Sequence, residues 1–168
     1  QVVGGVGVGK SIYAGGNVTA YVCDGNCTNT SNWSQTTFTA HVDGTSATWD
    51  DSRNFGLEFE TRSGEALLVW TNGRDSGTTD LAYATLANST TTWVQGGTID
   101  DTGSAADETF TFVDMARNST TNEIIIAAMD TTNSDLHAWV WNGETNSIRS
   151  GSELDVVTTL SVTTKKMF

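Results

Sequence analysis

The sequence contains no proline, only two cysteines, and eight basic residues against 20 acidic ones. The net charge of −12 argues against a nucleic-acid partner, because phosphate binding requires basic patches, and against anionic membranes. No run of about 18 apolar residues occurs, so we expect no membrane insertion. No stretch of about 12 residues has a convincing helical periodicity. These absences point to an acidic protein without significant helix.

Short runs of branched and aromatic residues lie between clusters of Gly, Asn and Asp, which favours strands. Residues 55–97 read as four strands, and residues 110–152 repeat that plan. An earlier partial copy lies at residues 20–21 and 33–35. A period of about 55–60 residues is typical of stacked β-modules, because one unit cannot bury its apolar faces alone. We therefore expect an all-β fold of antiparallel four-stranded repeat modules, either β-propeller-like or a β-sandwich.

Residues 1–168 are expected to form a single β domain with about two full and one or two partial repeats, and with a Gly/Val-rich arm at residues 1–12. Strands 65–71 and 123–129 should be the most buried, because both are near-continuous apolar runs. Turns are expected at Asp24-Gly25, Asn72-Gly73 and Asn142-Gly143. The last residues look like the first strand of a further, incomplete unit.

The two ends of the chain carry apolar residues that we expect to contact a neighbouring subunit. These are Val2, Val3, Val6, Val8, Val156, Val157, Leu160 and Val162. Strand addition at an open sheet edge uses main-chain donors and acceptors, so such ends can link copies of the chain. The alternative is closure within one subunit, in which residues 1–13 and 155–164 pair with each other.

Six sequons of the form Asn-x-Ser/Thr occur, at Asn17, Asn26, Asn29, Asn32, Asn88 and Asn118. Most lie at or beside expected turns, where a bulky glycan can be accommodated. The alternative is that Asn and Thr are simply turn and edge residues. The chain begins with Gln1, so we expect either a removed leader or a fragment.

Cys23 and Cys27 flank Asp-Gly-Asn, a strong turn sequence that can bring the two Cα atoms within reach of a disulfide. The alternative is a metal site, which only His41 and His137 could complete. A single Cys pair without a second close pair is a weak zinc signal, so we expect a disulfide and no metal.

Residues 4–11 match the phosphate-loop pattern GxxxxGK[ST]. That loop must follow a buried strand and open a helix, and the flanking sequence offers neither. Glu58 and Glu60 alternate with aromatic residues, so we expect an exposed charged strand face rather than a glycosidase pair. The acidic pairs at 50–51, 100–101 and 107–108 lie in expected loops and lack EF-hand spacing. We therefore expect no enzyme and no cofactor.

The six tryptophans fall at strand positions and are expected to fill the core rather than to form a sugar-binding platform. Trp139 and Trp141 share one strand face and could do either. His137, between apolar neighbours, is expected to be a packed strand residue.

Residues 63–70, and residues 122–130 followed by 135–143, resemble repeats of large bacterial and archaeal extracellular surface proteins with β-propeller-like modules. In such repeats a strand ending in Ser-Gly leads to an apolar strand, and a later strand ends in Trp-Asn-Gly. Met167-Phe168 resembles the opening of a further repeat, whereas the Gly-Val start and the Cys loop depart from the pattern. The resemblance covers about residues 11–168. It implies an extracellular or cell-surface protein without catalytic residues.

The first functional hypothesis is a secreted, glycosylated structural subunit of an extracellular filament, sheath or surface assembly, whose partner is another copy of the same chain. The copies would polymerise by strand exchange through their termini. The alternative is a lectin-like or adhesin module that binds carbohydrate or calcium through loop carboxylates and exposed tryptophan.

Overall fold

The computed structural model describes residues 6–7, 16–42, 54–71, 81–99, 110–130, 135–149 and 154–157. The strands within these residues are β1 (Val6–Gly7), β2 (Gly16–Cys23), β3 (Trp33–Val42), β4 (Phe55–Phe59), β5 (Ala66–Thr71), β6 (Leu81–Leu86), β7 (Val94–Ile99), β8 (Phe110–Arg117), β9 (Glu123–Asp130), β10 (Asp135–Asn142), β11 (Ser147–Ile148) and β12 (Leu154–Val157). The helical content of the described residues is a single 3-10 turn, η1 (Thr30–Asn32). None of these residues forms a helix long and apolar enough to cross a membrane.

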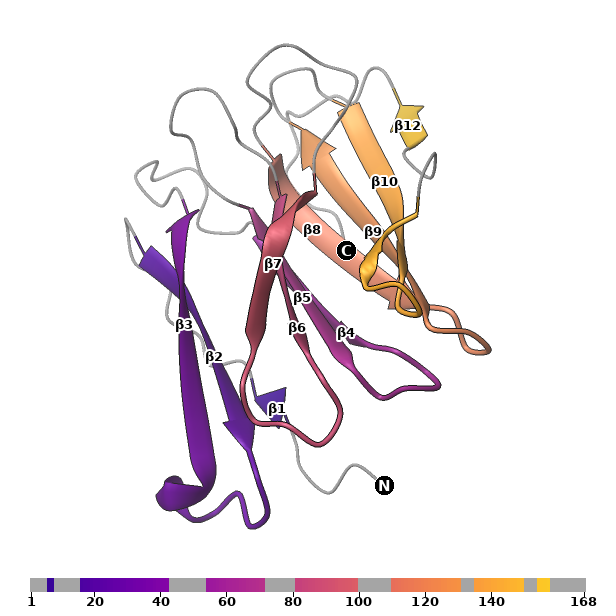
Figure 1. Cartoon of the computed structure of the whole chain (residues 1–168). Coiled ribbons are helices and arrows are strands. Elements are labelled where there is room, and N and C mark those ends of the chain that lie inside the picture. The colour runs from indigo at the N-terminus through magenta and orange to yellow at the C-terminus, as the bar shows by residue number, and fades with distance from the viewer. Residues whose placement is uncertain are drawn as a thin grey trace.

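The strands form three antiparallel sheets, which confirms the expected all-β class. The first sheet has the order β1-β2-β3, and the second has the order β4-β5-β6-β7. In the third sheet β8, β9 and β10 follow one another, and both β11 and β12 pair with β10. The β4–β7 sheet lies between the other two (Figure 1).

The central position of the β4–β7 sheet explains why β5 is its most buried strand. All six residues of β5 are buried, and their side chains alternate between two apolar cores. Leu68 and Trp70 pack in the first core with Phe38 of β3, whereas Leu67 and Val69 pack in the second core with β8, β9 and β10. A strand covered on both faces needs a continuous apolar run, as the sequence of β5 provides.

The same expectation for β9 is wrong in part, because β9 is covered on one face only. Ile124 and Ile126 are fully buried in the second core, but Ile125 between them is 54% exposed. Successive residues of a strand point to opposite faces, so the odd-numbered residues of β9 face away from the core. A near-continuous apolar run does not by itself show whether one or both faces are covered.

The β4–β5 and β8–β9 hairpins close in the same way, which sets up a correspondence between the second and third sheets. Phe59 pairs with Ala66 and Arg117 pairs with Ile124 at the last rung of each hairpin. The next backbone bond, from N of residue 60 to O of residue 65 and from N of residue 118 to O of residue 123, is 2.8 Å long in both. Ile125 is therefore the counterpart of Leu67, and Asn118 is the counterpart of Glu60.

The described parts of the two chain ends each pair within the chain. Val6 and Gly7 of β1 pair with Val22 and Tyr21 of β2. β12 pairs with β10 on the edge that also carries β11, so it extends the third sheet and does not begin a further unit as the sequence suggests. Among the described strand pairs, β1 and β12 do not pair with each other.

Candidate functional sites for modification and assembly

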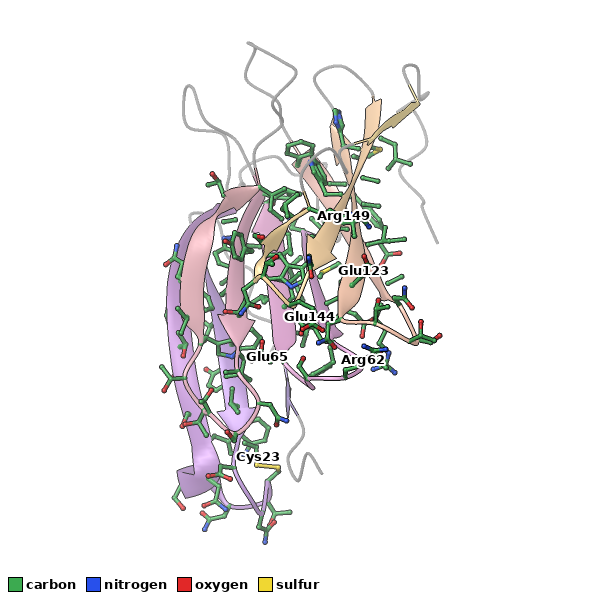
Figure 2. All side chains as sticks on the ribbon, turned by 45° about the vertical axis from the view of Figure 1, so that its right-hand side comes forward. Cys23, Arg62, Glu65, Glu123, Glu144 and Arg149 are labelled. Atoms are coloured by element: carbon green, nitrogen blue, oxygen red, sulfur yellow. A yellow bond between two sulfur atoms is a disulfide. The ribbon has the colours of Figure 1, made fainter. Side chains whose placement is uncertain are left out.

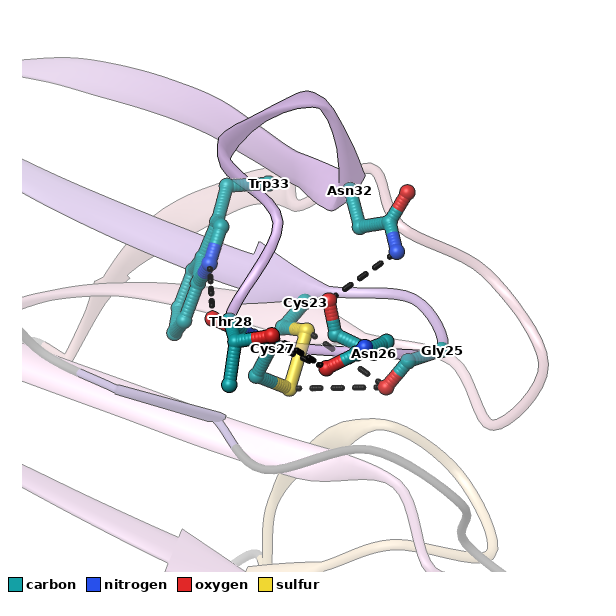
Figure 3. Close-up of a disulfide and its surroundings, with 7 residues drawn as sticks. All are labelled: Cys23, Gly25, Asn26, Cys27, Thr28, Asn32 and Trp33. Atoms are coloured by element: carbon teal, nitrogen blue, oxygen red, sulfur yellow. Dashed lines mark hydrogen bonds between the residues drawn. A yellow bond between two sulfur atoms is a disulfide. The ribbon is translucent and has the colours of Figure 1, made fainter.

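The loop between β2 and β3 is closed by the expected disulfide. Cys23 and Cys27 are bonded, with a distance of 5.6 Å between their Cα atoms (Figure 3). Gly25 lies between them with a φ of 92°, a left-handed conformation that glycine adopts without strain. The indole Nε1–H of Trp33 donates to the carbonyl of Cys27 at 3.0 Å. The bridge thus fixes a local loop at the end of the β2–β3 hairpin.

Removal of this bridge should destabilise the chain only moderately. The two cysteines are four positions apart, and closing so short a loop restricts the unfolded chain by about 2 kcal/mol. We expect the double variant Cys23→Ala, Cys27→Ala to lose about that much free energy of unfolding in urea denaturation. A reducing agent should destabilise the wild type to the same extent and leave the double variant unchanged. An equal response of both proteins to the reductant would contradict the assignment.

Three of the sequons share one side-chain geometry. In Asn26-Cys27-Thr28, the Oδ1 of Asn26 accepts from the backbone N and the Oγ1 of Thr28, at 3.1 and 2.8 Å. Asn29 accepts in the same way from Ser31, at 3.1 and 2.9 Å, and Asn118 from Thr120, at 2.9 Å in both bonds. All three asparagines are exposed.

Two other sequons use their asparagine to hold the fold. Nδ2 of Asn32 donates to the carbonyl of Asn26 at 3.0 Å, across the disulfide loop (Figure 3). Nδ2 of Asn88 donates to the carbonyl of Ser63 at 2.9 Å and so ties the β6–β7 turn to the β4–β5 turn. Asn17 lies in β2.

The third sheet presents an apolar face on the side away from the second core. We call this the outer face and define it by Ala116, Ile125, Ala127, Met129 and Ala138. Ile125 pairs with Ala116 of β8, and Ala127 pairs with Ala138 of β10, so the residues are contiguous. None of the five belongs to either core cluster of the described residues.

Glu60 lies at the joint between the second and third sheets, and its environment corrects the expectation of an exposed charged face. The residue is 3% exposed and follows the last residue of β4. Its Oε1 accepts from Nε1 of Trp141 at 3.0 Å, and its Oε2 accepts from Oγ of Ser63 at 2.5 Å. A Cβ at Gly143 would overlap this carboxylate, so glycine is required there.

Asn122 completes this joint from the β8–β9 turn. Its Oδ1 accepts from the backbone N of Arg62 and of Ser63, at 2.8 and 3.1 Å. Its Nδ2 donates to Oε1 of Glu144 at 3.1 Å. Arg62 and Glu144 lie on the same side of the molecule (Figure 2). Hydrogen bonds therefore connect three turns that are distant in the sequence, and they hold the second and third sheets together at this end.

The buried tryptophans fill the cores, as the sequence analysis favours. Trp139 and Trp141 are 1% and 0% exposed and belong to the second core, so neither is available as a sugar platform. Trp70 and Trp93 belong to the first core. His137 is buried as a packed strand residue, with its ring 5.6 Å from that of Phe110.

The expected subunit-contact residues fall only partly within the described residues. Val6 lies in β1, and Val156 and Val157 lie in β12. The others lie outside the described residues: Val2, Val3, Val8, Leu160 and Val162. The expected turn at Asn72-Gly73 and the acidic pairs at 50–51, 100–101 and 107–108 also lie outside them. Of the phosphate-loop pattern, the structure describes Val6-Gly7, which is an extended strand.

The described residues contain no group of three or more His, Cys, Asp or Glu that could hold a metal ion. No family model, no curated protein and no solved structure matches this chain.

Proposed function

We propose that this chain is a secreted, glycosylated structural subunit of an extracellular filament, sheath or surface assembly, in which copies of the chain associate with each other. The observation that carries the proposal is the outer face of the third sheet. Ile125 and Ala127 occupy the positions that Leu67 and Val69 occupy in the central sheet, where both are buried against the next sheet. A face of this kind is suited to pack against another sheet.

The order of the sheets supports an open mode of association. The first sheet packs on one face of the second, and the other face of the second packs on the third. Contacts of this head-to-tail kind use two different surfaces and do not close by themselves, so they can extend into filaments. The net charge of −12 makes copies repel, and we expect salt to strengthen their association.

Replacing Ile125 by aspartate should weaken self-association without unfolding the chain. Ile125 is 54% exposed in the isolated chain, so aspartate remains hydrated there but would be buried without a partner in a sheet-on-sheet contact. We expect the dissociation constant in sedimentation velocity to rise at least about tenfold.

The matched control for this variant is Val94→Asp. Val94 is 63% exposed on β7 and lies outside the outer face. We expect that this change leaves the association constant unaltered. If both variants associate as the wild type does, the outer face is not the contact surface.

Strand exchange through the termini is the second contact that we propose. β1 is two residues long and pairs only with β2 among the described strands, so little is lost when it detaches. In an exchanged assembly, Val6 and Gly7 of one copy would pair with Val22 and Tyr21 of the neighbour in the same register.

Deleting residues 1–10 tests this second contact. Because both apolar cores consist of residues beyond position 17, the shortened chain should fold with unchanged far-UV circular dichroism. We expect it to form shorter assemblies than the full chain in electron micrographs. Assembly of the deletion variant to full length would show that the N-terminal arm is not a linker, and β12 would be tested next.

The disulfide and the sequons support the extracellular part of the proposal. Disulfides persist in oxidising compartments outside the cytosol, and sequons are modified in secreted chains. Intact-mass measurement of native material tests this part: an unmodified polypeptide mass with two free thiols would refute it.

A further inference from the structure

The structure discriminates among the sequons, and we infer that Asn26, Asn29 and Asn118 carry N-linked glycans whereas Asn32 and Asn88 do not. This inference rests on the extracellular location in the proposed function. The geometry of each asparagine side chain carries it, together with the exposure of the first three asparagines.

In the three competent sequons, the side-chain oxygen is anchored and the side-chain nitrogen is turned outward. Both donors of the residue two positions on, its backbone N–H and its hydroxyl, bind Oδ1 of the asparagine. A glycosylated asparagine keeps its Oδ1, so these bonds survive modification. Nδ2 of Asn26 and of Asn29 makes no hydrogen bond to a described residue, and that of Asn118 makes one long contact, 3.4 Å, to Glu123.

In the other two sequons, the nitrogen that would accept the sugar is already bound to the protein. Nδ2 of Asn32 bonds the carbonyl of Asn26, and Nδ2 of Asn88 bonds the carbonyl of Ser63. A sugar on either nitrogen would have to enter the space between two turns of the chain. Asn32 is also only half-exposed, so a bulky glycan meets the disulfide loop there.

The modification is a group transfer from a lipid-linked sugar donor. Nδ2 forms a bond to the anomeric carbon of the sugar, and the bond from that carbon to the phosphate oxygen of a polyisoprenyl phosphate breaks. The lipid phosphate leaves with the electron pair, and one proton of Nδ2 passes to a base of the transferase. No oxidation or reduction occurs, and the protein supplies only the acceptor amide.

The position of Asn118 connects its glycan to assembly. Asn118 is the counterpart of Glu60, whose side chain reaches the neighbouring sheet at Trp141. A glycan on Asn118 therefore stands at the end of the outer face and limits how closely another sheet can approach. We expect Asn118→Gln to associate more tightly than the glycosylated wild type.

The test is site occupancy in the full chain secreted from a glycosylating host, measured by mass spectrometry of glycopeptides. We expect glycans on Asn26, Asn29 and Asn118 and background levels on Asn32 and Asn88. The matched variants are Asn118→Gln, which should lose the mass of one glycan, and Asn88→Gln, which should lose none. Glycans on Asn32 or Asn88 at the level of the other three, or a secreted chain without any glycan at Asn26, Asn29 and Asn118, would overturn the inference.

The outcomes for this inference and for the proposed function are distinguishable. If the secreted chain shows the expected pattern but native material carries no glycan, the extracellular location fails and the geometric selection stands. If native material is glycosylated on Asn32 and Asn88 as well, the location stands and the selection fails.

Discussion

Replacing Ile124 by alanine should lower the free energy of unfolding by about 2–5 kcal/mol. Ile124 is fully buried in the second core, between β5 of the central sheet and the tryptophans of β10. Truncation removes apolar area from the core and leaves a cavity that the two sheets cannot close, because their spacing is set by many other contacts. Urea denaturation, performed at a concentration at which the chain does not associate, measures the change.

The adjacent residue provides the control. Ile125 has the same side chain on the same strand, but it is 54% exposed on the outer face. We expect Ile125→Ala to cost less than about 1 kcal/mol under the same conditions. Equal losses for the two variants would show that β9 is covered on both faces, and the outer face would then be part of the core.

Replacing Glu60 by alanine should cost about 2–4 kcal/mol, since it leaves Nε1 of Trp141 and Oγ of Ser63 without their acceptor. Trp141 is fully buried, so water cannot replace the carboxylate there. Glu60→Gln retains one oxygen for the indole N–H and should lose less than the alanine variant. Thermal and urea unfolding of both variants measure these losses.

Glu58 is the control for this position. It is half-buried in β4, and its carboxylate bonds the adjacent backbone N of Phe59 at 2.9 Å. Glu58→Ala should change the free energy of unfolding by less than about 1 kcal/mol. If Glu58→Ala is as harmful as Glu60→Ala, the joint between the sheets does not depend on the Glu60–Trp141 bond.

Much of the fold follows from the sequence, because hairpins are local. The alternation of apolar runs with Gly, Asn and Asp clusters identifies β4 to β10, and the Asp-Gly-Asn turn identifies the disulfide. Burial on both faces of β5 is also visible, since its run is continuous. These features depend on residues that lie within one hairpin of each other.

The errors arise where partners are distant in the sequence. Period-2 alternation places Glu60 with Glu58, but β4 ends at Phe59, and the partner Trp141 is 81 positions away. Three consecutive isoleucines cannot show which one is exposed, because that depends on whether another sheet covers the face. The free or bound state of each sequon nitrogen likewise depends on a carbonyl in another turn, as Asn88 and Ser63 illustrate.

Electron cryomicroscopy of the chain isolated from its natural surroundings tests the central claim most directly. The account predicts ordered filaments or sheets that are built from repeated copies of this chain, with Ile125 covered by a neighbouring copy. A population of single, unassociated chains at every concentration, or an assembly in which Ile125 faces solvent, would contradict it.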